Sequence, residues 1–236
     1  MAHLIICGGT FVNLMHCLSV LSILCTFFVN AASLPLPYNE IEIMPFNPQG
    51  WYKNGPSLEW LIRRGNVKTV IEIGCWLGLS TRHIAKTLPE DGIVYAVDHW
   101  MGSPNEDNSS FDMANLYRQF LSNIIHENLT HKIIPLKMSS IEAAMLFSSA
   151  KEAWIRNVKP DLIYIDATHD FNSVIQDLVL WFPFIKGHGI LCGDDYFWDY
   201  DASKQGGPVM RAVDVFAREN NLTVHHDGWM WYLEEK

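Results

Sequence analysis

The feature that most constrains the fold is a buried strand that runs into a glycine turn and is followed by a second strand ending in an acid. Residues 70–73 are mainly apolar, Gly74 and Gly78 come next, and residues 94–97 lead to Asp98. A strand, a glycine turn, a helix, a second strand and an acid form half of a nucleotide-binding α/β unit. Glycine lets the backbone approach a ligand closely because it has no Cβ. The terminal acid is placed to accept hydrogen bonds from a ribose diol.

The rest of the chain alternates apolar strands with segments of helical periodicity. Expected strands cover residues 69–73, 93–97, 132–136, 161–166 and 189–193, and expected helices cover 58–64, 79–87, 111–126, 141–150, 172–182 and 208–219. Asp227-Gly228, between the short runs 222–226 and 229–233, is typical of a β-hairpin. We therefore predict an α/β fold: a Rossmann-like, seven-stranded, mostly parallel sheet with helices on both faces and a C-terminal antiparallel β-hairpin.

Composition limits the size of the folded unit and its partners. The chain has 236 residues, of which 49% are hydrophobic, so one domain with a large core is expected. We assign that domain to residues 56–236 and a Pro/Asn/Gly-rich linker to residues 34–55. The net charge is −9 and there is no basic run, which excludes nucleic acid because phosphate binding needs clustered Lys and Arg. A homodimer stays open.

The N-terminal segment differs from the rest of the chain. Residues 1–39 contain no Asp, Glu, Lys or Arg, and residues 14–29 are strongly apolar. The small residues near Ala31 that follow resemble the A-x-A cleavage site that signal peptidases recognise. Residues 1–33 are therefore predicted to be a signal peptide or an uncleaved membrane anchor, with a mis-called start codon as the third alternative. The protein is exported or membrane-anchored if the apolar segment is real, and otherwise cytoplasmic.

Acidic side chains gather at the expected carboxyl ends of the strands, where open α/β sheets bind their ligands. Asp166 ends the fourth strand, and Asp194 and Asp195 end the fifth. Without compensation these three carboxylates would repel one another. A divalent cation removes that penalty, and ligands that are all oxygen suit Mg²⁺, Mn²⁺ or Ca²⁺. We predict such a cation at Asp166, Asp194 and Asp195, with helix capping as the alternative role of each acid.

One long stretch resembles a known superfamily. The sequence DLIYIDATHD at residues 161–170, an amphipathic helix, and then LWFPFIKGHGILCGDD at residues 180–195 resemble class I S-adenosylmethionine (SAM)-dependent methyltransferases of the small-molecule O-methyltransferase type. Within it, the chain is most similar to a bacterial branch of macrolide-sugar O-methyltransferases and cephalosporin-hydroxylase-like proteins. The resemblance covers about residues 56–233. The Glu72-x-Gly74-x-x-x-Gly78 spacing and the reversed terminal hairpin also fit this superfamily.

The resemblance implies SAM as the cofactor and suggests contacts residue by residue. Glu72, Gly74 and Gly78 would line its methionine and ribose side. Ser80, at the start of a helix, would contact the SAM carboxylate with help from the helix N-terminus. Asp98 would hold the ribose hydroxyls.

The same resemblance implies where the adenine lies. His99 and Trp100 would border the edge or face of the base. Ser139 or Ser140, after the third strand, would face adenine. Asp166 is counted with these cofactor-binding residues as well as with the cation ligands and the catalytic residues.

The resemblance also bears on the cation and on catalysis. Asp166, Asp194 and Asp195 match the positions where catechol and caffeoyl-CoA O-methyltransferases keep three metal ligands. Those relatives have Asn at the third position, so Asp195 makes the site here more negative. His169 is a candidate general base, because an unperturbed histidine pKa near 6.5 suits proton removal at neutral pH. Capping the next helix or holding the loop is its alternative role.

The predicted function is transfer of a methyl group from SAM to a hydroxyl of a small-molecule acceptor, with a divalent cation as an aid. Phe197, Trp198 and Tyr200 would form a wall of the acceptor pocket. One alternative is a non-catalytic exported or membrane-tethered binding protein that keeps the fold, because SAM is a cytosolic metabolite. Another is a metal-dependent hydroxylase-like relative. A NAD-dependent dehydrogenase is disfavoured by the glycine spacing and by the terminal hairpin.

Overall fold

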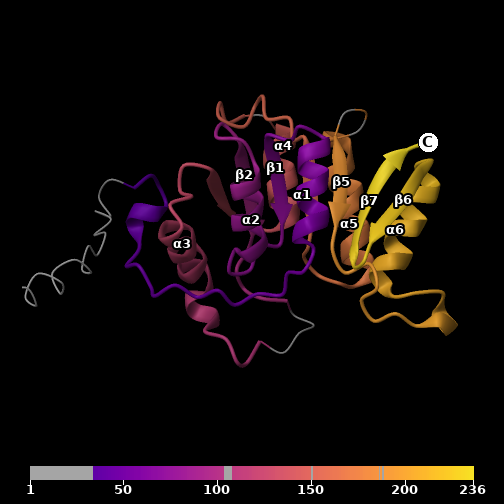
Figure 1. Ribbon diagram of the computed structural model, residues 1–236, viewed down its shortest axis with the longest axis horizontal. Coiled ribbons are helices and arrows are strands. Elements are labelled where there is room, and N and C mark those ends of the chain that lie inside the picture. The colour runs from indigo at the N-terminus through magenta and orange to yellow at the C-terminus, as the bar shows by residue number, and fades with distance from the viewer. Residues whose placement is uncertain (1–33, 104–107, 150, 186, 188) are drawn as a thin grey trace, which may run out of the picture.

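A seven-stranded sheet in the order β3-β2-β1-β4-β5-β7-β6 runs through the protein (Figure 1). The computed structural model describes residues 34–103, 108–149, 151–185, 187 and 189–236. The strands are β1 (Thr69–Ile73), β2 (Ile93–Asp98), β3 (Ile133–Lys137), β4 (Leu162–Ile165), β5 (Ile190–Gly193), β6 (Leu222–Asp227) and β7 (Met230–Glu235). Neighbours from β3 to β5 are parallel, whereas β7 is antiparallel to both β5 and β6. The predicted fold class is confirmed.

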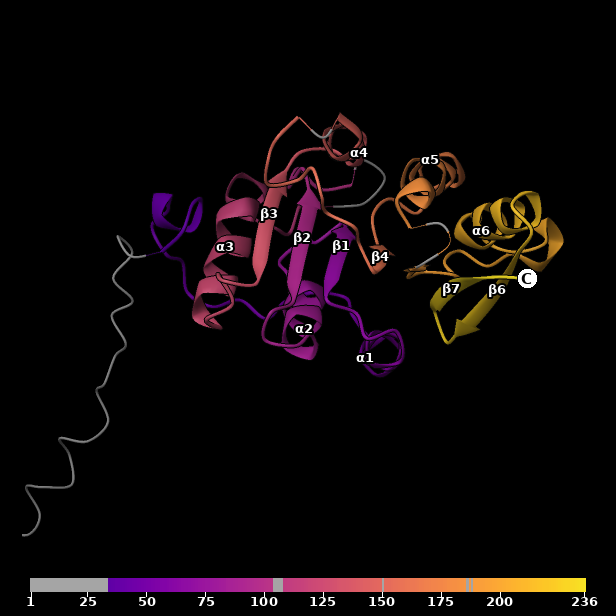
Figure 2. The same cartoon turned by 90° about the horizontal axis from the view of Figure 1, so that it is seen from above.

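Helices cover both faces of the sheet (Figure 2). They are α1 (Gly55–Arg64), α2 (Leu79–Thr87), α3 (Leu116–His126), α4 (Ser140–Ser149), α5 (Phe171–Trp181) and α6 (Pro208–Glu219), with short 3₁₀ turns at Tyr38–Glu40, Met113–Asn115, Phe182–Phe184 and Ala202–Lys204. Successive strand residues point to opposite faces. In β1, Val70 packs with α1, α2 and α3, whereas Ile71 and Ile73 pack with α4, α5 and α6. Burial on both faces explains why the parallel strands are nearly continuous apolar runs.

The strand order reverses between β1 and β4. From β1 the chain goes to β2 and β3 on one side, and the later strands add on the other side. Helices that follow neighbouring strands in opposite directions leave a crevice at this point, beyond the carboxyl ends of the strands. These ends face the lower edge of the view in Figure 1.

Some element boundaries differ from those predicted. Helix α1 begins at Gly55 rather than at residue 58, and Pro56 occupies its first turn, where its missing N–H costs nothing. The hairpin strands reach Asp227 and Met230, so the two-residue loop is Gly228-Trp229, one residue later than expected. Gly228 has φ +59°, which glycine adopts without strain.

Residues 34–55, which the sequence assigns to a linker, pack against the domain. The Tyr38 hydroxyl donates to the Ile133 carbonyl at 2.8 Å, and Tyr38 is buried. Asn123 on α3 accepts from the Asn47 N–H at 2.9 Å and donates to the Asn47 carbonyl at 2.8 Å. Asn123 also donates to the Leu77 carbonyl at 2.8 Å, in the turn after β1. This segment, the N-terminal strap, is thus tied to the glycine turn through one side chain.

Residues 1–33, where a signal peptide or membrane anchor is predicted, lie outside the described residues. Within the described ranges, no helix is long and apolar enough to cross a membrane. The nature of the N-terminal segment stays a prediction.

We expect Asn123→Ala to destabilise the protein by about 3 kcal/mol, because it leaves the partly buried Asn47 N–H and the buried Leu77 carbonyl without a partner. Urea unfolding measures this loss. Asn172→Ala, at an exposed position of α5, is the control and should change stability by less than about 0.5 kcal/mol. Equal stabilities of the two variants would contradict a role of Asn123 in holding the strap.

Candidate functional site

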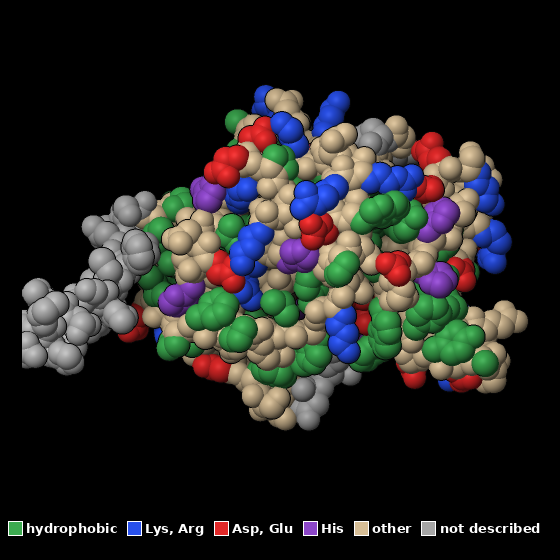
Figure 3. Space-filling model, viewed as in Figure 1, with side chains coloured by type: hydrophobic (Ala, Val, Ile, Leu, Met, Phe, Trp, Pro, Cys, Tyr) green, Lys and Arg blue, Asp and Glu red, His purple; other side chains and the backbone are tan. Residues whose placement is uncertain are grey.

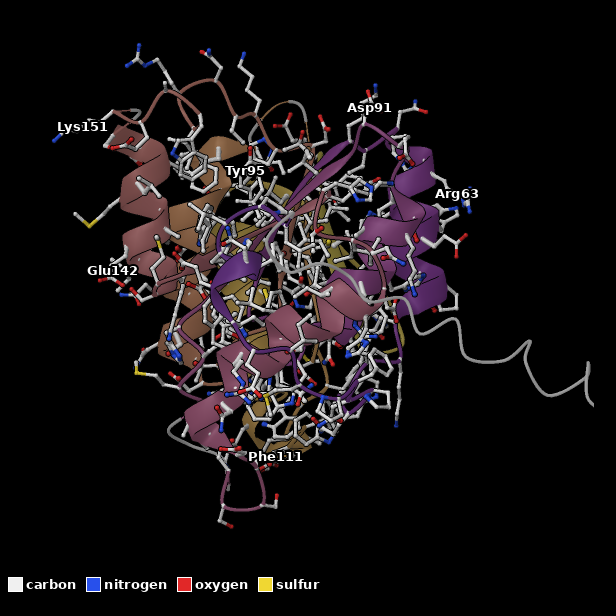
Figure 4. The ribbon with its side chains drawn as sticks, turned by 90° about the vertical axis from the view of Figure 1, so that its left-hand side faces the viewer. Arg63, Asp91, Tyr95, Phe111, Glu142 and Lys151 are labelled. Atoms are coloured by element: carbon white, nitrogen blue, oxygen red, sulfur yellow. The ribbon has the colours of Figure 1, made fainter. Side chains whose placement is uncertain are left out.

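A cavity of about 700 Å³ opens at the carboxyl ends of β1, β2 and β4. Its size is within the range of small-molecule sites. In Figure 3, hydrophobic side chains gather along this lower edge of the molecule. Figure 4 shows Phe111, in the loop after β2, at the same end, whereas Asp91, in the loop before β2, lies at the opposite end. A smaller cavity of about 280 Å³ lies between α1 and β7, away from the acids at the strand ends, so we do not regard it as the candidate site.

The two glycines of the turn are required by packing inside the protein. Gly74 has φ +87°, and a Cβ there would lie 1.9 Å from the carbonyl oxygen of Asp166. Gly78 has φ +80°, and its Cβ would lie 2.9 Å from the ring of Phe120. The backbone conformation and the neighbouring chain thus already exclude a side chain at both positions, and close approach of a ligand stays a prediction. Gly74 lines the cavity, whereas Gly78 lies outside its lining.

Glu72 and Ser80 lie beneath the turn rather than in the cavity wall. Glu72 has no exposed surface, and its Oε1 accepts from the Ser80 hydroxyl at 2.5 Å. Burial raises the pKa of Glu72 to about 7, and the nearby charge of Asp98 acts in the same direction. The pair joins β1 to α2, so the structure does not bring these two predicted cofactor contacts together with the cavity residues.

Asp98 lines the cavity and also holds the glycine turn. Its Oδ2 accepts from the N–H groups of Cys75 and Trp76 at 2.9 and 3.0 Å, and its Oδ1 accepts from the Trp100 N–H at 2.6 Å. His99 lines the cavity beside it, with its side chain 40% exposed. Trp100, which was predicted near the adenine, is buried in the core instead.

Ser139 and Ser140 both line the cavity at the start of α4. Ser139 forms a capping box with Glu142: the Ser139 N–H donates to Glu142 Oε2 at 2.9 Å, and Ser139 Oγ accepts from the Glu142 N–H at 3.3 Å. Ser140 Oγ donates to Asp177 Oδ1 at 2.5 Å and accepts from Trp181 Nε1 at 2.8 Å. Asp177, on α5, also lines the cavity, and sequence reasoning missed it because its position in a helix gives no motif.

The acids after β4 and β5 group differently from the prediction. One ligand atom from each of Asp166, His169 and Asp195 lies within 4.8 Å of the others, and Asp194 is not in this group. Asp195 has a left-handed backbone (φ +60°), and its Oδ2 lies 2.8 Å from His169 Nε2. Asp194 accepts instead from the Tyr164 hydroxyl at 3.3 Å and from the Asp195 N–H at 2.6 Å. Two aspartates and a histidine are thus the side chains that this geometry brings together, and the predicted cation at Asp166, Asp194 and Asp195 stays a prediction.

His169 lies in the cavity wall and does not cap the helix. Its neighbour Asp170 is the N-cap of α5 and accepts from the N–H groups of Asn172 and Ser173 at 3.1 Å. The ring of Trp198 lies 4.6 Å from the His169 ring. Both the His169 and the Asp195 side chains are less than one-fifth exposed, and partial burial strengthens a charge-assisted hydrogen bond between them.

Part of the N-terminal strap forms a wall that the sequence did not reveal. Trp51, Tyr52, Lys53 and Asn54 line the cavity, and the Tyr52 hydroxyl lies 2.8 Å from His83 Nδ1 on α2. The adjacent aromatic pair Trp51-Tyr52 within a Pro/Asn/Gly-rich segment was the available signal. The position of this pair in the cavity wall depends on contacts with residues far away in the chain, which the local sequence does not report.

Aromatic side chains of later segments form another part of the cavity wall. Trp198 and Trp229 line the cavity and are 39% and 48% exposed. Of the other two predicted wall residues, Phe197 packs on the rings of Tyr196 and His226, and Tyr200 is exposed outside the cavity lining.

The cavity is acidic. Among the described residues it is lined by Asp98, Asp166, Asp177, Asp194 and Asp195 against a single lysine, Lys53. Burial and the neighbouring Asp195 charge raise the pKa of Asp194. An excess of negative charge in a partly enclosed site favours a ligand that carries positive charge.

Comparison with known families identifies the domain. Residues 71–196 match the model of a family described as a methyltransferase domain. This range includes the glycine turn, Asp98 and the group Asp166, His169 and Asp195. No curated protein sequence matches the chain significantly.

Solved structures share the fold. A putative caffeoyl-CoA O-methyltransferase from Staphylococcus aureus is 15% identical, with a TM-score of 0.57 over 84% of this chain and 87% of that one. An O-methyltransferase from Bacillus cereus, in complex with SAH, is 18% identical, with a TM-score of 0.56 over 87% and 86%. The O-methyltransferase TomG from Streptomyces achromogenes, involved in tomaymycin synthesis and in complex with SAM, is 16% identical, with a TM-score of 0.56 over 80% and 82%.

The raised pKa of Glu72 predicts a specific pH dependence of stability. In the unfolded chain Glu72 loses its proton near its usual pKa of 4.5, whereas the folded protein keeps it until about pH 7. Stability therefore falls as the pH rises between these values, because unfolding releases the proton. Glu72→Gln removes this term, so relative to wild type it should gain up to about 3 kcal/mol between pH 5 and pH 8.

Urea unfolding at both pH values measures the difference. Glu219→Gln, at the exposed end of α6, is the control and should follow the wild type. Other raised carboxyl groups keep their own pH dependence in both proteins and cancel in the comparison. Parallel pH profiles of wild type and Glu72→Gln would contradict the buried, protonated state.

Proposed function

The chain belongs to the methyltransferase domain family, and we propose that it transfers the methyl group of SAM to a hydroxyl group of a small molecule. The observation that carries this proposal is the acidic cavity at the switch point of the sheet, with Asp98 at one side and the His169–Asp195 pair at the other. The similar O-methyltransferase structures in complex with SAH or SAM support the same reaction.

The residues present fit a SAM molecule. The sulfonium of SAM is a cation, and the five aspartates of the cavity wall favour a cation there. A carboxylate accepts about four hydrogen bonds, and the three backbone donors of Asp98 leave room for a ribose hydroxyl. In this arrangement Asp98 binds the ribose beside Gly74, and the acceptor lies at the ends of β4 and β5.

Bound SAM supplies an electrophilic methyl group on its sulfonium. The chain has to hold a hydroxyl oxygen in line with that methyl group at about 3 Å and to remove the hydroxyl proton. His169 takes this proton. Asp195, whose Oδ2 lies beside His169 Nε2, stabilises the imidazolium that forms. Trp198 packs on the His169 ring and limits the access of water to the pair.

A divalent cation is a second use of the same residues. The nitrogen and oxygen ligands of His169, Asp166 and Asp195 suit Mn²⁺, Fe²⁺ or Zn²⁺ better than an all-oxygen set would. Such a cation would lower the pKa of an acceptor hydroxyl. A His169 that is bound to a metal is not free to take the acceptor proton, so the two uses exclude each other at one moment.

The walls favour an acceptor with an apolar face. The cavity-lining residues Trp51, Trp198 and Trp229 are all more than one-third exposed. Exposed aromatic rings at a cavity mouth supply contact area for a planar or apolar ligand. The hydroxyl to be methylated would extend from that face toward His169.

Asp98→Asn should weaken SAM binding at least about tenfold, because it removes the charged acceptor for the ribose. Isothermal titration calorimetry measures the Kd. Asp161→Asn is the matched control: Asp161 also binds two backbone N–H groups, those of Lys68 and Thr69, but at the opposite end of β1. No SAM binding by the wild type would refute the proposed function and favour a binding protein that only keeps the fold.

Calorimetry with Mn²⁺ tests the cation. We expect the wild type to bind one Mn²⁺ and Asp195→Asn to bind it at least about tenfold more weakly. Asp194→Asn removes the same charge one residue away, outside the group, and should retain most of the affinity. Equal losses in both variants would favour the three-aspartate site. No binding by the wild type would leave the His169–Asp195 pair to act without a metal.

A further inference from the structure

A buried carboxylate in the cavity wall has no role in the chemistry described so far. Asp177, on α5, is only 6% exposed, yet it lines the cavity. Its Oδ1 accepts from Ser140 Oγ at 2.5 Å, and Ser140 Oγ accepts from Trp181 Nε1 at 2.8 Å. No lysine or arginine of the described chain forms an ion pair with it. A buried carboxylate without a cation is costly, so its presence needs a reason.

The hydrogen bonds that link Trp181, Ser140 and Asp177 can run in only one direction. An indole N–H can only donate, so Ser140 must accept from Trp181 and must give its own proton to Asp177 Oδ1. Asp177 Oδ2 receives no hydrogen bond from the described residues. Since Asp177 lines the cavity, a ligand can supply the missing donor.

The sheet topology decides which part of a ligand lies there. Asp98 pairs with Lys137 across β2 and β3, and the Met138 N–H donates to the Asp98 carbonyl at 3.0 Å. Ser140 follows two residues later at the start of α4, after β3, the strand beside Asp98, and Asp177 reaches Ser140 from α5. The group Asp166, His169 and Asp195 lies on the other side, beyond β1. If Asp98 binds the ribose and the acceptor lies by β4, the base extends toward Asp177.

We propose that Asp177 selects the base of the cofactor by accepting a hydrogen bond from the exocyclic amine of adenine. This inference rests on the proposed function, since it requires SAM in the cavity. An ionised carboxylate is an acceptor only, so it pairs with an N–H donor and repels a carbonyl oxygen. Hypoxanthine, which has a carbonyl in place of the amine, should therefore bind poorly. Ser140 orients the carboxylate, and Trp181 orients Ser140.

The charge state of Asp177 agrees with this role. Burial raises its pKa to about 6, and the charge of Asp170 on the same helix acts in the same direction. On the helices packed against α5, Glu142 of α4 is bound to Ser139 and Arg211 of α6 lies over the Phe171 ring. At neutral pH Asp177 is therefore ionised and accepts from an amine, whereas below pH 6 it carries a proton.

The test compares S-adenosylhomocysteine with S-inosylhomocysteine, which differ at the base, by calorimetry. Wild type should prefer the adenine compound at least about tenfold. Asp177→Asn keeps an oxygen for Ser140 and presents an NH₂ group to the cavity, so it should abolish or invert the preference. Asp170→Asn, which removes a charge from the same helix outside the cavity, is the matched control and should keep it.

The pH dependence of the wild type tests the inference without a variant. The preference for adenine should decline as the pH falls from 8 to 5, because protonated Asp177 becomes a donor. Other groups that titrate affect both compounds and cancel in the ratio. If wild type binds both compounds but the ratio is unchanged in Asp177→Asn and across the pH range, the role of Asp177 is refuted and the proposed function stands. If wild type binds neither, both fail.

Discussion

The close contact between the ends of β1 and β4 is the constraint on which the rest of the site depends. A Cβ at residue 74 would lie 1.9 Å from the Asp166 carbonyl oxygen, so these two backbones can meet only where one residue is glycine. The contact sets where the sheet order reverses and brings the turn after β1 beside the loop after β4. Asp98 completes the arrangement by binding the N–H groups of Cys75 and Trp76. The crevice beyond these strand ends is the cavity.

The acids of the cavity wall hold the surrounding structure together. Asp98 holds the glycine turn, Asp177 joins α5 to α4 through Ser140, and Asp194 accepts from the Tyr164 hydroxyl. Each carboxylate thus has some of its hydrogen bonds satisfied by the protein, which orients it before a ligand arrives. Preorganised charges of this kind interact strongly with a cationic ligand because they need no reorganisation. The same burial raises the pKa values of Asp177 and Asp194.

Much of the fold was predicted from local sequence patterns. The features that the sequence did not predict have physical causes. Apolar runs of strand length and helical periodicity predicted the sheet, since burial of these faces is what drives the layers together. The sequence did not reveal that Gly74 is also required by its contact with residue 166, which is distant in the chain. Asp194 was grouped with Asp166 and Asp195 because all three follow the ends of the fourth and fifth strands, and the family resemblance supported that grouping. The structure places Asp195 Oδ2 2.8 Å from His169 Nε2, and no sequence pattern reports that contact.

The sequence by itself determined the class of fold, the strand ends that meet at one edge, and the presence of Asp98, Asp166 and His169 at that edge. The sequence determines these features because the alternation of side chains along a strand or helix is a local property of the chain. Only the tertiary structure decided that residues 50–54 line the cavity, that Asp177 reaches it from α5, and that His169 pairs with Asp195. These are contacts between segments distant in the chain, and they depend on how the helices pack and on single backbone angles rather than on periodicity.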